Sequence, residues 1–208
     1  YKIISLEELD SLLTATERDT HAEGLGLGLG KKYLCITMDD GYFSNYDLAY
    51  PLFKKYRVPA SVFAVTDYVT NQIGIQKFTW NQAATMEKSG YMKVYSHTAD
   101  HQPVVAGKEE AFLDSMHRSE ETLTENLGTK HVKAMAYPNG RYTEAAQQLL
   151  DEDGYVLQFT VENSVITRKT KRDAIPRITI ESGMSGEDVV RKIELTAENT
   201  FAAEGEGN

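Results

Sequence analysis

The sequence predicts an α/β fold built on a mostly parallel sheet, open or closed into a barrel. Short apolar, strand-like runs alternate with amphipathic helical segments along the chain, which is the pattern of a parallel sheet covered by helices. The main polar clusters each follow a strand-like run, where such folds place their functional sites. The chain has 208 residues, of which 41% are hydrophobic and 25% charged. That composition suits one domain with a sizeable core.

The individual elements follow from hydrophobic periodicity and capping signals. Ser5 and Glu8 form a capping box before leucines at helical spacing, so a helix is expected to begin at Leu6. The Gly/Leu alternation at 23–30 is expected to be a connection, because it lacks the Lys-Ser/Thr ending of a phosphate-binding loop. The other expected helices are 45–56, 79–89, 108–127, 143–153 and 186–195. The expected strands are 33–38, 60–65, 92–96, 132–137, 155–160 and 174–180.

This series of elements predicts a single domain over residues 1–208. Its core is expected at 31–195, and the small and acidic residues of 196–208 predict a flexible tail. Six strands in this length fall short of the eight strands and ~250 residues of a complete TIM barrel.

Charge and cysteine content restrict the classes of partner. The net charge of −9 and pI near 5.1 argue against nucleic acid or an anionic membrane surface bound by bulk electrostatics, but not against a neutral glycan. No run approaches the ~18 apolar residues of a membrane span. The single cysteine, Cys35, lies in an apolar run and is predicted to be a buried small hydrophobe. The oligomeric state does not follow from these data.

Two polar clusters at strand ends predict a metal site. Asp39 and Asp40 end one strand, and His97 and His101 follow another in "YSHTADH". The i, i+4 histidines face one way if the segment turns helically, and two imidazoles with one carboxylate form a three-ligand catalytic zinc site. The second carboxylate can then serve as a base. A cation would also offset the repulsion between the adjacent aspartates; the alternative is a pair of surface histidines without a metal.

Three ordered motifs resemble the NodB-homology polysaccharide deacetylases, the family-four carbohydrate esterases. They are "TMDDGY", "SHTADH" and "YPNG", and the resemblance spans roughly residues 31–180. It implies a distorted (β/α)7-type barrel of mostly parallel strands. It also implies hydrolysis of N-acetyl groups on N-acetylglucosamine polymers or, less often, of O-acetyl groups on xylan, and a location outside the cell or at the bacterial cell surface.

The resemblance assigns roles to individual residues. Asp39 matches the general base, and the matched metal ligands, for Zn²⁺ or another divalent transition metal, are Asp40, His97 and His101. Thr98 occupies the Ser/Thr position that supports the histidine loop. In "YPNG", Tyr137 and Pro138 shape the loop, and the backbone N–H of Asn139, where the family usually has tyrosine, matches the oxyanion donor.

One departure from the family concerns the arginine that normally pairs with the base. In the third motif of this chain, alanine (Ala136) stands where the family has that arginine, and alanine cannot form such a pair. We predict that Arg177, in the late segment "IPRI", reaches the Asp39 carboxylate instead; a surface position for Arg177 is the alternative.

A second departure concerns the histidine acid of the family's Leu-x-His motif. No histidine follows His131. Such departures occur in the biofilm-type, poly-N-acetylglucosamine deacetylase branch, where the barrel is permuted and this histidine precedes the first motif. We therefore expect a barrel incomplete at its N-terminus, with a gap beside its last strand and the acid on a strand absent from this chain. His21 is the internal alternative.

Three functions are left open by these residues: an N-deacetylase of a β-linked N-acetylglucosamine polymer, an acetylxylan-type O-deacetylase, and an impaired glycan-binding module that keeps the metal. His117 and His131 are expected in surface or packing roles, and Trp80 in the core rather than as a sugar-stacking platform.

Overall fold

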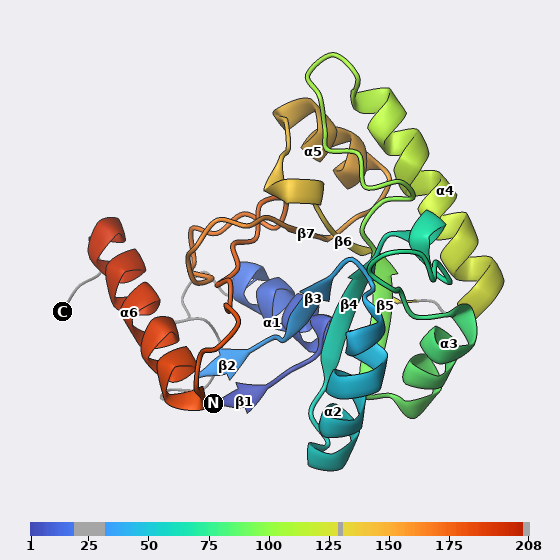
Figure 1. Cartoon of the computed structure of the whole chain (residues 1–208). Coiled ribbons are helices and arrows are strands. Elements are labelled where there is room, and N and C mark those ends of the chain that lie inside the picture. Colours follow the sequence, from blue (N-terminus) through green and yellow to red (C-terminus); the bar gives the residue numbers. More distant parts are fainter. Residues whose placement is uncertain (19–31, 129–130, 206–208) are drawn as a thin grey trace.

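The computed structural model describes residues 1–18, 32–128 and 131–205 (Figure 1). Its centre is a five-stranded parallel sheet in the order β3-β4-β5-β6-β7. The strands are β3 (Thr37–Asp39), β4 (Ala60–Ala64), β5 (Met92–Ser96), β6 (Ala134–Ala136) and β7 (Leu157–Phe159). The sheet curls into an open half-barrel, so the predicted α/β class and the incomplete barrel are confirmed.

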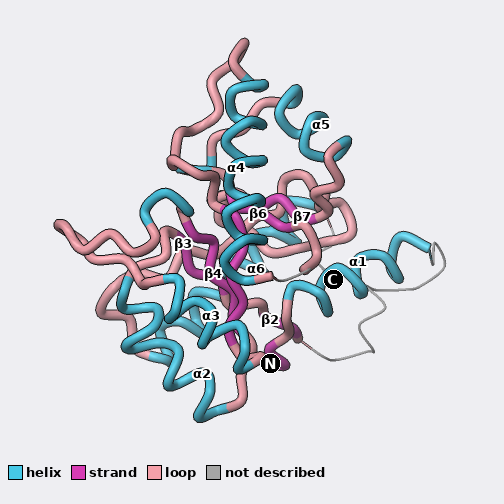
Figure 2. Tube along the Cα trace, turned by 90° about the vertical axis from the view of Figure 1, so that its right-hand side faces the viewer, coloured by secondary structure: helices cyan, strands magenta, loops and turns pink. Residues whose placement is uncertain are grey.

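The described part of the chain contains six α-helices. They are α1 (Leu6–Arg18), α2 (Tyr50–Tyr56), α3 (Trp80–Ser89), α4 (Glu109–Leu127), α5 (Glu144–Glu152) and α6 (Gly186–Glu204). A π-helix, η1 (Asn45–Ala49), leads into α2, and 3₁₀ turns lie at η2 (Thr66–Tyr68) and η3 (Pro138–Gly140). Figure 2 shows α2 and α3 on one side of the strands and α1 on the other. None of these helices combines the length and apolar character needed to cross a membrane.

Strand alternation divides the core into an inner and an outer layer. On β4, Phe63 joins a cluster with the α1 leucines, whereas its neighbours Val62 and Ala64 pack with α2 and α3 residues. On β6, Met135 belongs to a third cluster, formed with residues of α4 and α5. Successive strand side chains point to opposite faces. Helix α1 therefore fills the concave side of the sheet, and α2 to α5 cover the convex side.

The predicted capping box at Ser5 is confirmed. The Ser5 hydroxyl accepts the Glu8 N–H at 3.2 Å, and the Glu8 carboxylate accepts the Ser5 N–H at 3.0 Å. The same reciprocal pair joins Thr79 and Gln82 at the start of α3. The expected connection at 23–30 lies outside the described residues.

Two expected strands differ in the structure. The run 33–38 divides between β2 (Tyr33–Leu34), which pairs with β1 (Lys2–Ile3) in a separate two-stranded sheet, and β3. The segment 174–180 forms a single bridge, at Ile175, to Phe159 of β7. The ladder stops there because the Arg177 N–H donates to the Glu162 carbonyl at 2.9 Å, whereas the Thr160 carbonyl that would continue it accepts the Arg177 side chain.

Part of the expected flexible tail, 196–208, is helical, because α6 continues through residues 196–204; residues 206–208 lie outside the described part of the chain. The Ser164 and Thr200 hydroxyls lie 2.9 Å apart, and the Thr167 hydroxyl donates to Glu204 at 2.8 Å. The helix ends at Gly205 in a left-handed conformation. Alanine and glutamate in this stretch are good helix formers, and these contacts hold the helix to the preceding loop.

Candidate active site

The candidate site lies at the carboxyl ends of β3 and β5. Asp39 is the last residue of β3, and Asp40 and Gly41 follow with φ of 70° and 67°. This left-handed turn redirects the chain, and it needs glycine at 41, where a Cβ would lie 3.3 Å from the Phe78 ring. His97 directly follows β5. The sheet therefore brings together residues almost 60 positions apart.

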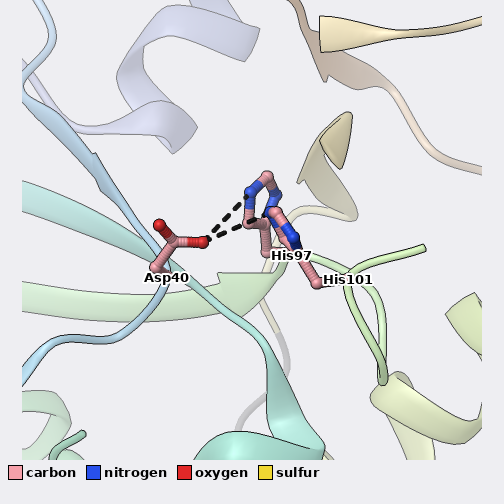
Figure 3. A group of neighbouring side chains, drawn as sticks. All are labelled: Asp40, His97 and His101. Carbon is pink, nitrogen blue, oxygen red and sulfur yellow. Dashed lines mark ion pairs between the residues drawn. The ribbon is translucent and has the colours of Figure 1, made fainter. Parts of the chain in front are cut away.

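Asp40, His97 and His101 converge on one point (Figure 3). Asp40 Oδ1 lies 3.8 Å from His97 Nε2 and 3.3 Å from His101 Nε2, and the three ligand atoms lie within 4.8 Å of one another. The predicted convergence of the histidines is confirmed, but a helical turn does not produce it. Thr98 and His101 instead adopt left-handed φ of 68° and 58°.

The orientation of His97 suits metal binding. Its Nδ1 lies 2.6 Å from the Ala136 carbonyl oxygen, so Nδ1–H donates and Nε2 keeps a free lone pair toward Asp40. Burial lowers the pKa of His97, which favours the neutral imidazole that ligates metals. One carboxylate oxygen and two imidazole nitrogens form the donor set of a catalytic zinc site. The residues present therefore fit the implied metal.

Arg177 forms a bidentate ion pair with Asp39. Its Nη1 and Nη2 donate to the two carboxylate oxygens, each at 2.7 Å, and its Nε donates to the Thr160 carbonyl at 2.8 Å. Burial alone would raise the pKa of Asp39, but the guanidinium outweighs it and holds that pKa below its usual value. The prediction that Arg177 reaches Asp39 is confirmed. Since β3 and β7 are the edge strands and Thr160 directly follows β7, the Arg177 side chain links the two edges of the open barrel.

The "YPNG" segment forms η3 after β6. Asn139 has a left-handed φ of 56°, Pro138 is buried, and the buried Tyr137 hydroxyl donates to Gln158. Gly140 cannot carry a side chain here, because a Cβ would lie 2.3 Å from Val161 Cγ2. The assignment of the Asn139 N–H as oxyanion donor stays a prediction.

Two residues beside the site were not found from the sequence. A hydrogen bond to Asp40 raises the pKa of the Tyr42 hydroxyl, and Lys77 Nζ lies 3.7 Å from the centre of the Tyr42 ring. Tyr42 directly follows the aspartate pair, so adjacency was an available signal. Lys77 reaches the site through an antiparallel bridge with Tyr42 that no local pattern indicates.

The other histidines in the described ranges lie elsewhere, as predicted. His117 Nε2 lies 3.3 Å from Asp153, and His131 Nε2 lies 2.9 Å from Glu87. Trp80 is partly buried against the core, also as predicted. His21 lies outside the described residues, so the source of the acid stays a prediction, as does a preceding strand.

Comparison with known proteins identifies the family. The polysaccharide deacetylase family model matches residues 27–157. This chain therefore belongs to the polysaccharide deacetylase family.

Several relatives share the fold over most of the chain. The Streptococcus pyogenes deacetylase PplD, solved in complex with acetate, is 25% identical with a TM-score of 0.78, covering 93% of this chain and 80% of its own. IcaB from Ammonifex degensii is 26% identical with a TM-score of 0.76, covering 92% and 81%. A poly-β-1,6-N-acetyl-D-glucosamine N-deacetylase of Staphylococcus epidermidis is 29% identical over 162 residues, covering 73% of this chain and 56% of the relative. The chain spans 55% to 61% of the length of the curated relatives it matches.

Proposed function

We propose that this protein is a metal-dependent hydrolase that removes N-acetyl groups from a β-linked N-acetylglucosamine polymer. The observation that carries the proposal is the convergence of Asp40, His97 and His101 beside the Asp39–Arg177 pair. The substrate class is supported by the printed activity of the staphylococcal relative.

The proposed roles follow from the contacts of each side chain. Asp40, His97 and His101 would hold the divalent cation, proposed to be Zn²⁺, which supplies Lewis acidity toward the acetyl carbonyl and lowers the pKa of attacking water. Asp39 takes the proton from that water, and Arg177 keeps Asp39 ionised until it does so. The Asn139 N–H is proposed to stabilise the negative charge that develops on the carbonyl oxygen.

The departing amine needs a proton, which distinguishes this reaction from ester hydrolysis. Neither His117 nor His131 is available to supply it, because both contact carboxylates away from the site. An ester releases an alkoxide, which depends less on a positioned acid than an amine does. This observation supports the acetylxylan-type O-deacetylase as the second candidate.

Acetate release tests both functions. The protein would be incubated with a β-1,6-linked N-acetylglucosamine oligomer, a chitooligosaccharide and an acetylated xylooligosaccharide, each with Zn²⁺ or with chelator. We expect zinc-dependent release from an N-acetylglucosamine oligomer. Release from the xylan substrate alone would support the second candidate, and glycan binding without release would indicate an impaired binding module.

The cellular location is proposed from the substrate. A polymer of biofilms or cell walls lies outside the membrane, so we propose that the protein acts outside the cell or at the bacterial surface. Fractionation of the source cells, followed by detection of the protein, tests this.

A further inference from the structure

The loop that carries the metal ligands holds an unfavourable backbone conformation. Thr98 and His101 have φ of 68° and 58°, a left-handed region that non-glycine residues rarely adopt, because it brings Cβ close to the following carbonyl oxygen. His97 is fixed by β5 and by the Ala136 carbonyl. His101 lies beyond the strained turn, and its side chain is 28% exposed. Contacts from outside the loop must therefore hold His101 in place.

One such contact comes from Ser115, a residue of α4 that is 3% exposed. Its hydroxyl accepts the Ala99 N–H at 3.1 Å and donates to Asp100 Oδ1 at 2.8 Å. Its carbonyl oxygen also lies within hydrogen-bond distance of the Ala99 nitrogen, at 3.2 Å. Ser115 thus binds the two residues between Thr98 and His101.

A second contact comes from Arg118, three residues further along α4. Its Nη2 donates to Asp100 Oδ2 at 3.0 Å, and its Nη1 lies 3.4 Å from Asp67 Oδ2. The Asp67 N–H in turn donates to the Ala99 carbonyl at 2.9 Å. Both oxygens of Asp100 are therefore bonded to α4, and the loop is held from two sides.

Within the loop, Thr98 completes the arrangement. Its hydroxyl accepts the His101 N–H at 2.9 Å. This bond ties His101 to Thr98, but it can position the imidazole only if the whole turn is itself fixed. The loop therefore transmits the anchoring by α4 to the ligand.

We propose that Ser115 and Arg118 are positioning residues for the metal ligand His101, acting through Asp100. The inference rests on the proposed metal site and goes beyond it, because it makes helix α4 a determinant of metal affinity. Residues that orient metal ligands typically change affinity 10- to 100-fold when they are lost. We expect Ser115→Ala in that range. Arg118→Met should change affinity about 2- to 5-fold, because its side chain is 54% exposed and its ion pairs are screened.

The test is a zinc titration of the folded, metal-free protein against a chromophoric chelator. Matched controls are Ser89→Ala on α3, whose hydroxyl bonds the Met86 carbonyl, and Arg191→Met on α6, which is exposed. Both controls should keep wild-type affinity. Circular dichroism of each metal-free variant verifies that the fold is retained.

Two combined variants test the route of the effect. Ser115→Ala and Asp100→Ala together should cost less than the sum of their separate losses. In a His101→Ala background, Ser115→Ala should leave the residual zinc affinity unchanged, an outcome that a general loss of stability would not produce.

The possible failures are distinguishable. If folded wild-type protein binds no zinc, the proposed function is overturned. If wild-type protein binds zinc and Ser115→Ala binds it equally well, the positioning role is overturned. Should Ser115→Ala fail to fold, Arg118→Met and Asp100→Asn decide the matter: wild-type affinity in both refutes the role, and weakened affinity with an intact fold supports it.

Discussion

Two clusters of charged side chains on the central sheet share residue types but differ in how their charges are paired. The site cluster lies at the carboxyl ends of the strands and contains Asp39, Asp40, His97, His101 and Arg177. The Glu7 cluster lies around β5 and α1 and contains Glu7, Glu87, Lys93, Tyr95 and His131. Each combines carboxylates, histidine and a cation.

In the Glu7 cluster, each carboxylate has a cationic or hydrogen-bonding partner. Glu7 accepts from Lys93 and from the Tyr95 hydroxyl, each at 2.8 Å, and Glu87 lies 2.9 Å from His131. Glu87 also accepts the Val94 N–H at 2.6 Å. This N–H has no partner on β6, because β6 pairs with β5 at Ser96, further along the strand. Glu87 thus satisfies a backbone N–H of β5, and the five side chains form a structural network.

In the site cluster, one carboxylate is paired with a cation and the other faces imidazole nitrogens. Arg177 neutralises Asp39, whereas Asp40 faces the Nε2 atoms of two histidines. Burial lowers the pKa of His97, which favours the neutral imidazole, whose Nε2 offers a lone pair rather than a positive charge. The comparison teaches that pairing geometry, and not residue composition, distinguishes a candidate metal site from a structural charge cluster.

The largest expected effect is on catalysis, through Asp39→Asn. Loss of the base should reduce acetate release about 10²- to 10⁴-fold, while zinc affinity falls much less, because Asp39 is not among the three convergent ligands. Acetate assays and zinc titration on the same sample measure both. Near-normal acetate release by Asp39→Asn would remove Asp39 from the base role.

The next effect is on stability, through Arg177→Met. It leaves Asp39 partly buried and without its guanidinium, which should cost about 3 kcal/mol in the free energy of unfolding. Urea denaturation measures this, with Arg191→Met as the exposed control. The pKa of Asp39 should also rise, because burial then acts without the guanidinium. The acidic limb of the activity profile should therefore move to higher pH; an unmoved limb would contradict the assignment.

Zinc binding should affect the stability of variants in the site cluster and the Glu7 cluster differently. At a free zinc concentration of 100 times Kd, wild-type protein should gain about 2.7 kcal/mol of stability, seen as a rise in Tm. His101→Ala should lose this gain. His131→Ala should start from a lower Tm, because it leaves Glu87 without its partner, yet keep the zinc-dependent rise. An equal loss in both variants would mean that the clusters are not functionally distinct.

The smallest effect is expected from Glu7→Gln. Burial raises the pKa of Glu7, but hydrogen bonds from Lys93 and Tyr95 outweigh it and lower the pKa from 4.5 to about 2. A drop of this size corresponds to about 3 kcal/mol, and since the side chain is 34% exposed, solvent screening reduces this to about 1–2 kcal/mol.

The pH dependence has a definite sign. Because the folded-state pKa of Glu7 is depressed, its contribution is present above about pH 4.5 and is lost as pH falls toward about 2. Glu7→Gln should therefore flatten the stability profile in that window without changing zinc affinity. Urea unfolding at a series of acidic pH values measures it, and identical profiles for wild type and variant would show that Glu7 is not held ionised.

Local patterns in the sequence determined several elements of this protein. The capping boxes at Ser5 and Thr79 and the glycine at 128 mark helix ends, because those interactions involve residues a few positions apart. The motifs containing Asp40, His97 and His101 predicted a candidate ligand set, and the structure brings these three residues together.

Tertiary structure decided what depends on contacts between distant segments. Arg177 meets Asp39 across 138 positions, and Lys77 meets Tyr42 through one isolated bridge. The division of the run 33–38 between two sheets depends on β1 as well as on β4. The sequence therefore determined which residues could bind a metal. The family resemblance also predicted that Arg177 pairs with Asp39, with a surface position for Arg177 as the alternative. The curled sheet, whose strand ends bring remote side chains within a few ångströms, decided between the two.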